Sequence, residues 1–196
     1  MSIQTRKQAL RQSIIDDRSN MGDAERASLS KKIAGRVTGL DAYHTAVTVL
    51  GYMNFGAEFA AEIFVRRALR DGKQVLLPKV NRDTKQLDVY RITDLAHDVA
   101  PGLWNIPEPR SERCDKMDDL ASIDFILLPG VAFGRDGTRL GYGGGFYDKL
   151  IARMPHQPAL VAAAFTLQVV EHIPQEATDR KVQWLITEQE TIRCDA

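Results

Sequence analysis

The sequence predicts an α/β domain built as a three-layer sandwich: a mostly parallel central sheet, helices on both of its faces, and a pair of helices at the N-terminus. The first observation is a series of apolar runs of strand length, at 46–53, 74–78, 124–128, 160–165 and 182–187. Continuous apolar runs of this length are typical of strands buried on both faces. The second observation is that helical patterns separate the first two runs, and the third from the fourth. The 196 residues fit one domain, 1–196.

The opening segment of the chain predicts the two N-terminal helices. One runs from Thr5 to about Ser19 and carries its apolar residues on one side. The other runs from Asp23, its expected N-cap, to about Val37. We therefore expect both helices to form before the chain enters the sheet.

The middle of the chain predicts a strand-helix-strand unit. An amphipathic helix at 58–70 lies between the apolar runs 46–53 and 74–78, so these two strands should be parallel and joined by a right-handed crossover. Weak alternation predicts an edge strand at 86–91, and three prolines predict a loop at 101–109. Because ligands of such sheets bind beyond the C-terminal ends of the strands, we expect the functional site there.

Composition and charge limit the partners of this protein. Lys and Arg total 26, as do Asp and Glu, so no global field would attract nucleic acid or an anionic membrane. The sequence shows neither an apolar run of membrane-span length nor an apolar signal core at its N-terminus. Cys114 and Cys194 are isolated, and the four histidines show no metal-ligand spacing. We therefore expect a cytoplasmic protein with no nucleic-acid or membrane partner.

The most informative stretch is 139–148, where four glycines fall within the five positions 141–145, just before a helical pattern. Glycines let backbone N–H groups approach an anion closely, and the start of a helix adds partial positive charge. The stretch lacks the Gly-Lys-Ser/Thr ending of a P-loop, and Phe146 stands where a dinucleotide fingerprint has its third glycine. It indicates a different kind of phosphate site, and the alternative is a structural turn without a ligand.

Residues 129–133 and 137–148 resemble the signature of the 5-formyltetrahydrofolate cyclo-ligase family, whose members are also called methenyltetrahydrofolate synthetases. Three other segments resemble the family in the same order: Lys7-x-x-x-Arg11, Tyr52-Met53 with Glu58, and Leu103–Pro109. The resemblance therefore covers the chain almost from end to end.

The resemblance implies an ATP- and Mg²⁺-dependent enzyme that cyclises 5-formyltetrahydrofolate to 5,10-methenyltetrahydrofolate and releases ADP and phosphate. In the implied route, the formyl oxygen attacks the γ-phosphate of ATP and gives an imidate phosphate at N5. N10 then attacks the activated carbon, and phosphate leaves as the ring closes. The implied partners are ATP and a formylfolate, with or without a polyglutamate tail, and we expect the protein to act as a monomer.

The resemblance also implies roles for individual residues. Those that would bind ATP are Lys7, Arg11, Arg139, Leu140, Gly141, Tyr142, Gly143, Gly144, Gly145, Phe146 and Tyr147. Those that would bind the folate are Met53, Glu58, Trp104, Tyr142, Gly143, Gly144, Gly145 and Phe146. Asp148 and Asp179 would bind Mg²⁺, and Arg139 and Asp148 would be the catalytic residues. From the residues alone, Lys7 and Arg11 fit a solvated helix face better, and Trp104 fits an apolar core equally well.

Two other functions stay open at this point. One is a different α/β enzyme, such as a sugar-phosphate isomerase or a CoA-transferase-like enzyme, which would need a catalytic carboxylate and no Mg-ATP site. The other is a non-catalytic relative that binds folate or nucleotide. The second alternative predicts loss of the phosphate-binding residues, yet Lys7, Arg11, Arg139 and Asp148 are all present.

Overall fold

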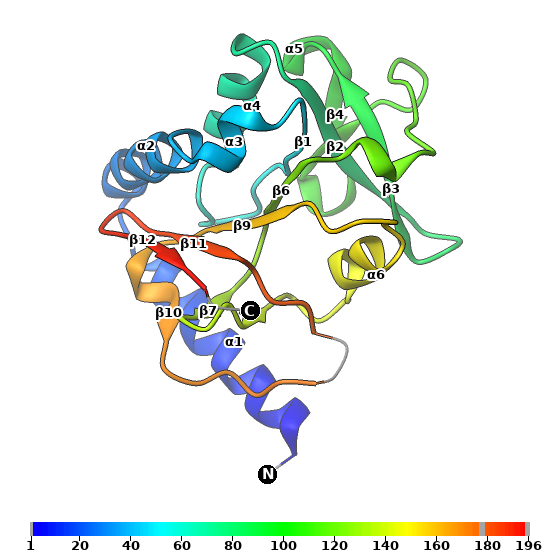
Figure 1. Ribbon diagram of the computed structural model, residues 1–196. Helices are drawn as coiled ribbons and strands as arrows, with labels where there is room; N and C mark the ends of the chain where they lie inside the picture. The colour runs from blue at the N-terminus through cyan, green and yellow to red at the C-terminus, as the bar shows by residue number, and fades with distance from the viewer. Residues whose placement is uncertain (1, 177–178, 195–196) are drawn as a thin grey trace.

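The computed structural model describes residues 2–176 and 179–194. Its centre is a seven-stranded sheet in the order β12-β11-β9-β6-β1-β2-β3 (Figure 1). The inner strands pair in parallel, and the edge strands β3 and β12 are antiparallel to their neighbours. These strands are β1 (Thr48–Leu50), β2 (Gln74–Asn81), β3 (Gln86–Ile92), β6 (Phe125–Leu128), β9 (Ala159–Ala163), β11 (Trp184–Ile186) and β12 (Thr191–Arg193). The predicted α/β class with a mostly parallel sheet is confirmed.

Alternate residues of the central strands point into two apolar layers, as expected for strands buried on both faces. Val49 and Phe125 pack in one layer with helices, and Leu50 and Ile126 pack in the other. The helices of the first layer are α2 (Asp23–Thr38), α3 (Asp41–Thr45) and α4 (Ala61–Arg70), and α6 (Phe146–Ala152) covers the second. Helices thus cover both faces of the sheet (Figure 1).

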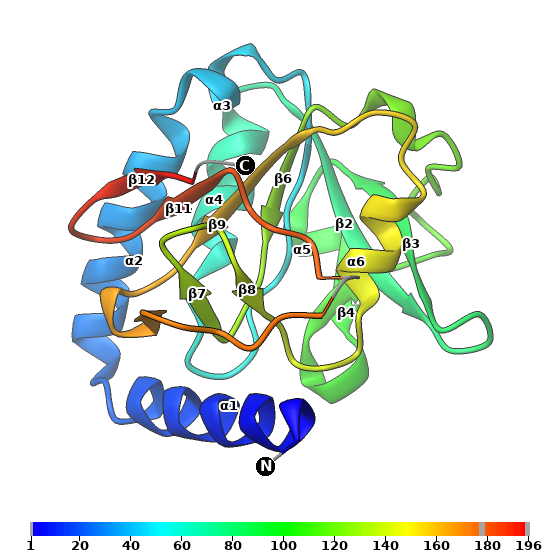
Figure 2. The same cartoon turned by 60° about the horizontal axis from the view of Figure 1, so that its bottom comes forward.

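Helix α1 (Ile3–Ser19) lies apart from these layers, against a small three-stranded sheet (Figure 2). This sheet has the order β10-β7-β8 and consists of β7 (Ala132–Gly134), β8 (Arg139–Leu140) and β10 (Val169–Val170). Ile14 of α1 packs there with Val131 and Leu140. Both predicted N-terminal helices therefore form, but they pack on different sheets, and α1 is brought to the glycine-rich turn.

Several boundaries differ from the pattern-based prediction. The segment 101–109 was expected to be a loop, which is wrong: β4 (Val99–Pro101) and β5 (Pro107–Pro109) pair as a hairpin around a 3₁₀ turn at Leu103–Asn105. Prolines are tolerated there because a two-stranded ribbon consists of edge strands. Strand β1 ends at Leu50 and α4 begins only at Ala61, so 51–60 connects them as a loop. The remaining elements are α5 (Leu95–Asp98), η2 (Leu120–Ser122) and η3 (Thr166–Gln168).

Candidate active site

A cavity of about 520 Å³ lies beyond the C-terminal ends of β1 and β6, where ligands of parallel sheets bind. Four structures meet around it: α1, the loop after β1, the β4–β5 hairpin and the glycine-rich turn at 141–145. All the residues expected from the sequence to bind ATP or folate line it, and so does Asp148. Asp179 is not among the lining residues of the described chain. The volume is in the range of small-molecule sites, about 300–1,000 Å³.

The glycine-rich turn has a backbone that few other residues could adopt. Gly143 has φ +102° and Gly145, the residue before α6, has φ +62°. L side chains rarely take these conformations. At Gly144 the limit is space, because a Cβ would lie 2.6 Å from the ring of Phe146. Backbone conformation therefore favours glycine at 143 and 145, and lack of space favours it at 144.

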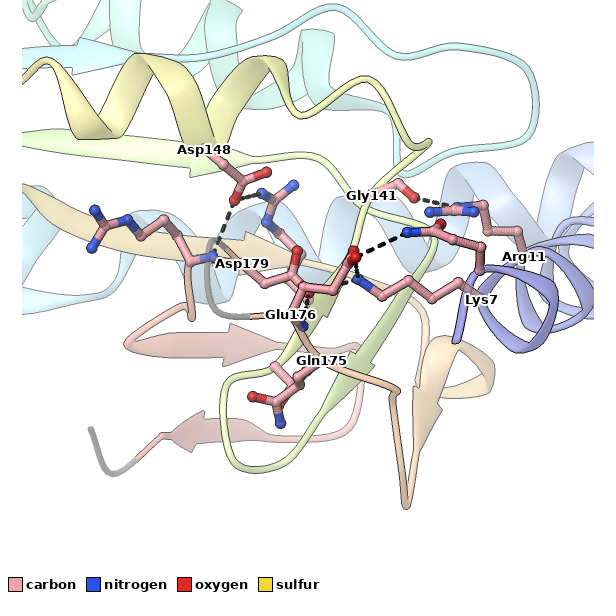
Figure 3. Close-up of polar contacts among 11 residues, drawn as sticks. Lys7, Arg11, Gly141, Asp148, Gln175, Glu176 and Asp179 are labelled. Carbon is pink, nitrogen blue, oxygen red and sulfur yellow. Dashed lines mark hydrogen bonds and ion pairs between the residues drawn. The ribbon is translucent and has the colours of Figure 1, made fainter. Parts of the chain in front are cut away.

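Helix α1 turns a basic face toward this turn. Lys7, Arg11, Ile14 and Arg18 recur at helical spacing and lie on its inner side, with Lys7 and Arg18 only 4% and 3% exposed. Lys7 Nζ lies 2.8 Å from Glu176 Oε2 and 2.7 Å from Asp179 Oδ2 (Figure 3). Arg11 Nε donates to the carbonyl of Gly141 over 2.8 Å. The alternative of a solvated face does not hold for Lys7.

The charge of Lys7 is well supported by these two carboxylates. Burial opposes the charged form, but the hydrogen bonds to Asp179 and Glu176 outweigh it and raise the pKa of Lys7 above its usual value. Lys7 is therefore held as an ammonium ion at the edge of the cavity.

Arg139 and Asp148 form the second ion pair of the site. Arg139 Nη2 donates to Asp148 Oδ1 over 2.8 Å, and Arg139 Nη1 donates to the carbonyl of Pro129 over 3.2 Å. The Nε of this buried guanidinium has no partner among the described residues. Asp148 Oδ1 also accepts the backbone N–H of Arg180, the residue after Asp179, over 3.1 Å. The two expected Mg²⁺ ligands thus belong to neighbouring stretches of chain, each paired with an expected phosphate-binding cation (Figure 3).

The lining of the cavity also includes a buried acid, Glu58, which is 5% exposed. Its Oε2 accepts the backbone N–H of Phe55 over 2.7 Å, and its Oε1 accepts the hydroxyl of Tyr142 over 2.6 Å. Burial raises the pKa of Glu58, and these two bonds together with the charge of Arg18 counteract part of that rise. The carboxylate is fixed in position by bonds to both of its oxygens.

Aromatic and apolar side chains complete the lining of the cavity. Trp104 lines the cavity with 64% of its surface exposed, so it does not belong to the core. Its backbone has φ +56° at the tip of the β4–β5 hairpin. Phe55 and Tyr142 meet edge to face with ring centroids 6.3 Å apart, and Met53, which is 9% exposed, also lines the cavity. Exposed aromatic surface beside a fixed carboxylate is suited to a planar ligand with N–H groups.

Comparison with known proteins identifies the protein family of this chain. The model of the 5-formyltetrahydrofolate cyclo-ligase family matches residues 3–188. The chain belongs to this family. A probable 5-formyltetrahydrofolate cyclo-ligase of Caenorhabditis elegans is 31% identical over 152 residues, which are 74% of each chain. The 5-formyltetrahydrofolate cyclo-ligase of Escherichia coli K12 is 30% identical over 145 residues, which are 72% of this chain and 78% of that one. The mouse enzyme is 26% identical over 196 residues, 96% of each chain.

Solved structures agree with the family match. The 5,10-methenyltetrahydrofolate synthetase of Aquifex aeolicus superposes with a TM-score of 0.82 and 30% identity, covering 97% of this chain and 93% of its own. The Mycoplasma pneumoniae synthetase has the same fold, with a TM-score of 0.74 at 21% identity and coverage of 93% and 98%. The predicted family and the predicted class of enzyme, a ligase, are confirmed.

Some residues of the candidate site were missed by sequence reasoning. Arg18 donates to the Tyr142 hydroxyl over 2.9 Å, and its position seven residues after Arg11 on the same helix face was the available signal. Glu176 accepts from Lys7 and also from Gln4, at 2.9 Å, but no local pattern marks it. The predicted roles of the site residues stay predictions. No cluster of three or more His, Cys, Asp or Glu side chains suited to a metal occurs in the described part of the chain.

Proposed function

We propose that this protein cyclises 5-formyltetrahydrofolate to 5,10-methenyltetrahydrofolate, with conversion of ATP to ADP and phosphate. The observation that carries the proposal is that one cavity is lined both by paired cations and by a fixed carboxylate with exposed aromatic surface. The glycine-rich turn contacts both sets of residues, Arg11 through Gly141 and Glu58 through Tyr142. The family match favours this function over the isomerase, transferase and non-catalytic alternatives.

The chemistry of the proposed reaction explains why residues for phosphate and residues for folate are needed in the same cavity. The carbon of an N-formyl group is a poor electrophile, and its oxygen leaves readily only after phosphorylation. Attack of that oxygen on the γ-phosphate gives the imidate phosphate and ADP, and attack of N10 on the carbon then expels phosphate and closes the ring, with loss of the N10 proton. The task left to the protein is alignment and charge neutralisation.

Lys7, Arg11 and Arg139 would neutralise the nucleotide phosphates. Lys7 and Arg139 now pair with carboxylates, and phosphate oxygens are equivalent acceptors for the same donors. The unpartnered Nε of Arg139 gives its guanidinium a further donor for such an oxygen. Asp148 and Asp179, relieved of these cations, fit Mg²⁺, which typically takes one or two carboxylates beside phosphate oxygens and water. Bound there, Mg²⁺ would offset the negative charge of the phosphates.

Glu58 would accept hydrogen bonds from N–H groups of the pterin ring, while Trp104 and Met53 would form apolar walls. Tyr142 to Phe146 would border both ligands, where the formyl oxygen and the γ-phosphate must meet. We further propose that the enzyme acts as a monomer in the cytoplasm. Its cavity is lined by residues of one chain, and Cys114 and Cys194 are isolated in the sequence, as is usual in a reducing compartment.

One assay tests the proposed reaction. Protein, 5-formyltetrahydrofolate and Mg-ATP are mixed, and the absorbance of methenyltetrahydrofolate is followed together with ADP release. We expect one ADP for each methenyl product. Absence of product would refute the proposed function, and product formed without ATP would refute the phosphorylated intermediate.

A further inference from the structure

Arg18 is a buried cation that neither the apolar core nor the expected ATP site accounts for. It lies in the last turn of α1, 3% exposed, and its Nε has no partner in the part of the chain that is described. Burying a guanidinium costs several kcal/mol unless a counter-charge and hydrogen bonds compensate it. Ile14 already packs α1 against the small sheet, so anchoring the helix does not require a charge at this position.

The two hydrogen bonds that join Arg18, Tyr142 and Glu58 can have only one donor–acceptor order. Arg18 Nη2 donates to the Tyr142 hydroxyl over 2.9 Å, and that hydroxyl lies 2.6 Å from Glu58 Oε1. A guanidinium has no acceptor, and a hydroxyl has a single proton. With its oxygen accepting from Arg18, the Tyr142 proton must be directed at Glu58. Arg18 therefore orients the hydroxyl and supplies the positive charge that faces a buried carboxylate.

We propose that Arg18 is a positioning residue for folate, which acts through Tyr142 to hold the Glu58 carboxyl group correctly oriented in the cavity. This inference rests on the proposed folate-binding role of Glu58. Two arginines of one helix would then have different roles: Arg11 binds the main chain of the glycine-rich turn at Gly141, and Arg18 holds the side chain of the next residue, Tyr142, which bonds to Glu58.

The pKa of Glu58 supports the same assignment. Burial raises it, and Arg18 is the cation that counteracts the rise, beside the Phe55 and Tyr142 bonds. Without Arg18 the carboxylate would bind a proton more readily and lose its value as an acceptor. Removing Arg18 should therefore weaken the binding of a ligand that donates to Glu58 and leave unaffected a ligand held by Lys7 and Arg139, which do not bond to Arg18.

The test is an Arg18→Met variant assayed for the KM of each substrate. We expect the KM for 5-formyltetrahydrofolate to rise about 10- to 100-fold, the loss typical of a charge-assisted hydrogen bond, with the KM for ATP within about twofold of wild type. Arg18→Lys should restore part of the binding because it keeps the charge. Arg6→Met, on the exposed side of the same helix, is the matched control and should leave both KM values unchanged.

A double-mutant cycle shows whether Arg18 acts through Glu58. In a Glu58→Gln background, which already lacks the carboxylate, Arg18→Met should add less than about a twofold effect. A full effect in that background, an equal rise in both KM values, or no effect on folate would each overturn the inference. If Arg18→Met does not fold, as judged by circular dichroism, Tyr142→Phe breaks the same chain and should show the same folate-selective loss. Absence of product from the wild type would refute the proposed function itself, whereas normal wild-type activity with an unaffected Arg18→Met would refute this inference alone.

Discussion

Replacing Gly143 by alanine tests whether the backbone of the glycine-rich turn is required. Gly143 has φ +102°, and an added Cβ would have the Arg11 guanidinium as its nearest group, at 3.5 Å. That distance is ordinary van der Waals contact, so the cost comes from the backbone and not from a clash. A non-glycine residue in such a sparsely populated region costs about 1–3 kcal/mol. The reduced entropy of the unfolded chain offsets about 0.4–1 kcal/mol of this.

The variant can respond in two ways. If the turn keeps its conformation, we expect the free energy of unfolding to fall by about 1–2 kcal/mol. If the turn relaxes instead, its N–H groups leave their positions, and the KM for ATP should rise about tenfold or more. Urea unfolding measures the first response and steady-state kinetics the second.

Gly35 provides the matched control. It lies exposed inside α2, and a Cβ there would meet nothing within 4 Å. Gly35→Ala should stabilise the protein by about 0.5–1 kcal/mol, because alanine is the better helix former. The same substitution should thus have opposite signs at the two positions. Wild-type stability combined with a wild-type KM for ATP in Gly143→Ala would refute the requirement for this backbone conformation.

Three further substitutions test other parts of the molecule. Asp148→Asn removes the charged partner of the buried Arg139. We expect turnover to fall about 100-fold or more and the free energy of unfolding to fall by about 1–3 kcal/mol. Normal turnover would contradict the proposed role of Asp148 as a metal ligand. Trp104→Ala should raise the KM for 5-formyltetrahydrofolate about tenfold. It should change the free energy of unfolding by less than about 0.5 kcal/mol, because the side chain is 64% exposed. An unchanged KM would exclude Trp104 as a wall of the site. Hydrogen bonds from Lys181 and Thr138 lower the pKa of Asp136 to about 2, so its stabilising effect exists above its ordinary value of 3.8 and is lost as pH falls toward about 2. Asp136→Asn should therefore lower the free energy of unfolding by at most about 1 kcal/mol at neutral pH, because the Lys181–Asp136 pair is half exposed. In urea unfolding near pH 2 the difference from wild type should vanish. A difference that does not depend on pH would contradict a contribution of this ion pair.

Part of the fold and site could be predicted from the chain alone. Apolar runs of strand length need burial on both faces wherever they occur, so β2, β6 and β9 follow from local composition. The short strands β7, β8 and β10 could not be found in this way, since two or three residues carry no measurable periodicity. The hairpin of β4 and β5 was missed because prolines at an edge resemble prolines in a loop.

The residue types at the site were determined by the sequence. The sequence contains the glycines at 141–145, the Lys7–Arg11 spacing and the carboxyl group of Glu58. The glycine-rich signature is long enough to identify the family from the sequence alone. Tertiary structure alone decided which charges meet. Arg18 and Glu58 are separated by forty positions, and Tyr142 lies more than eighty beyond Glu58, yet a chain of two hydrogen bonds joins them. Such contacts arise from the packing of α1 on the small sheet, and hydrogen bonds between residues distant in sequence leave no local pattern that a reading of the chain could detect.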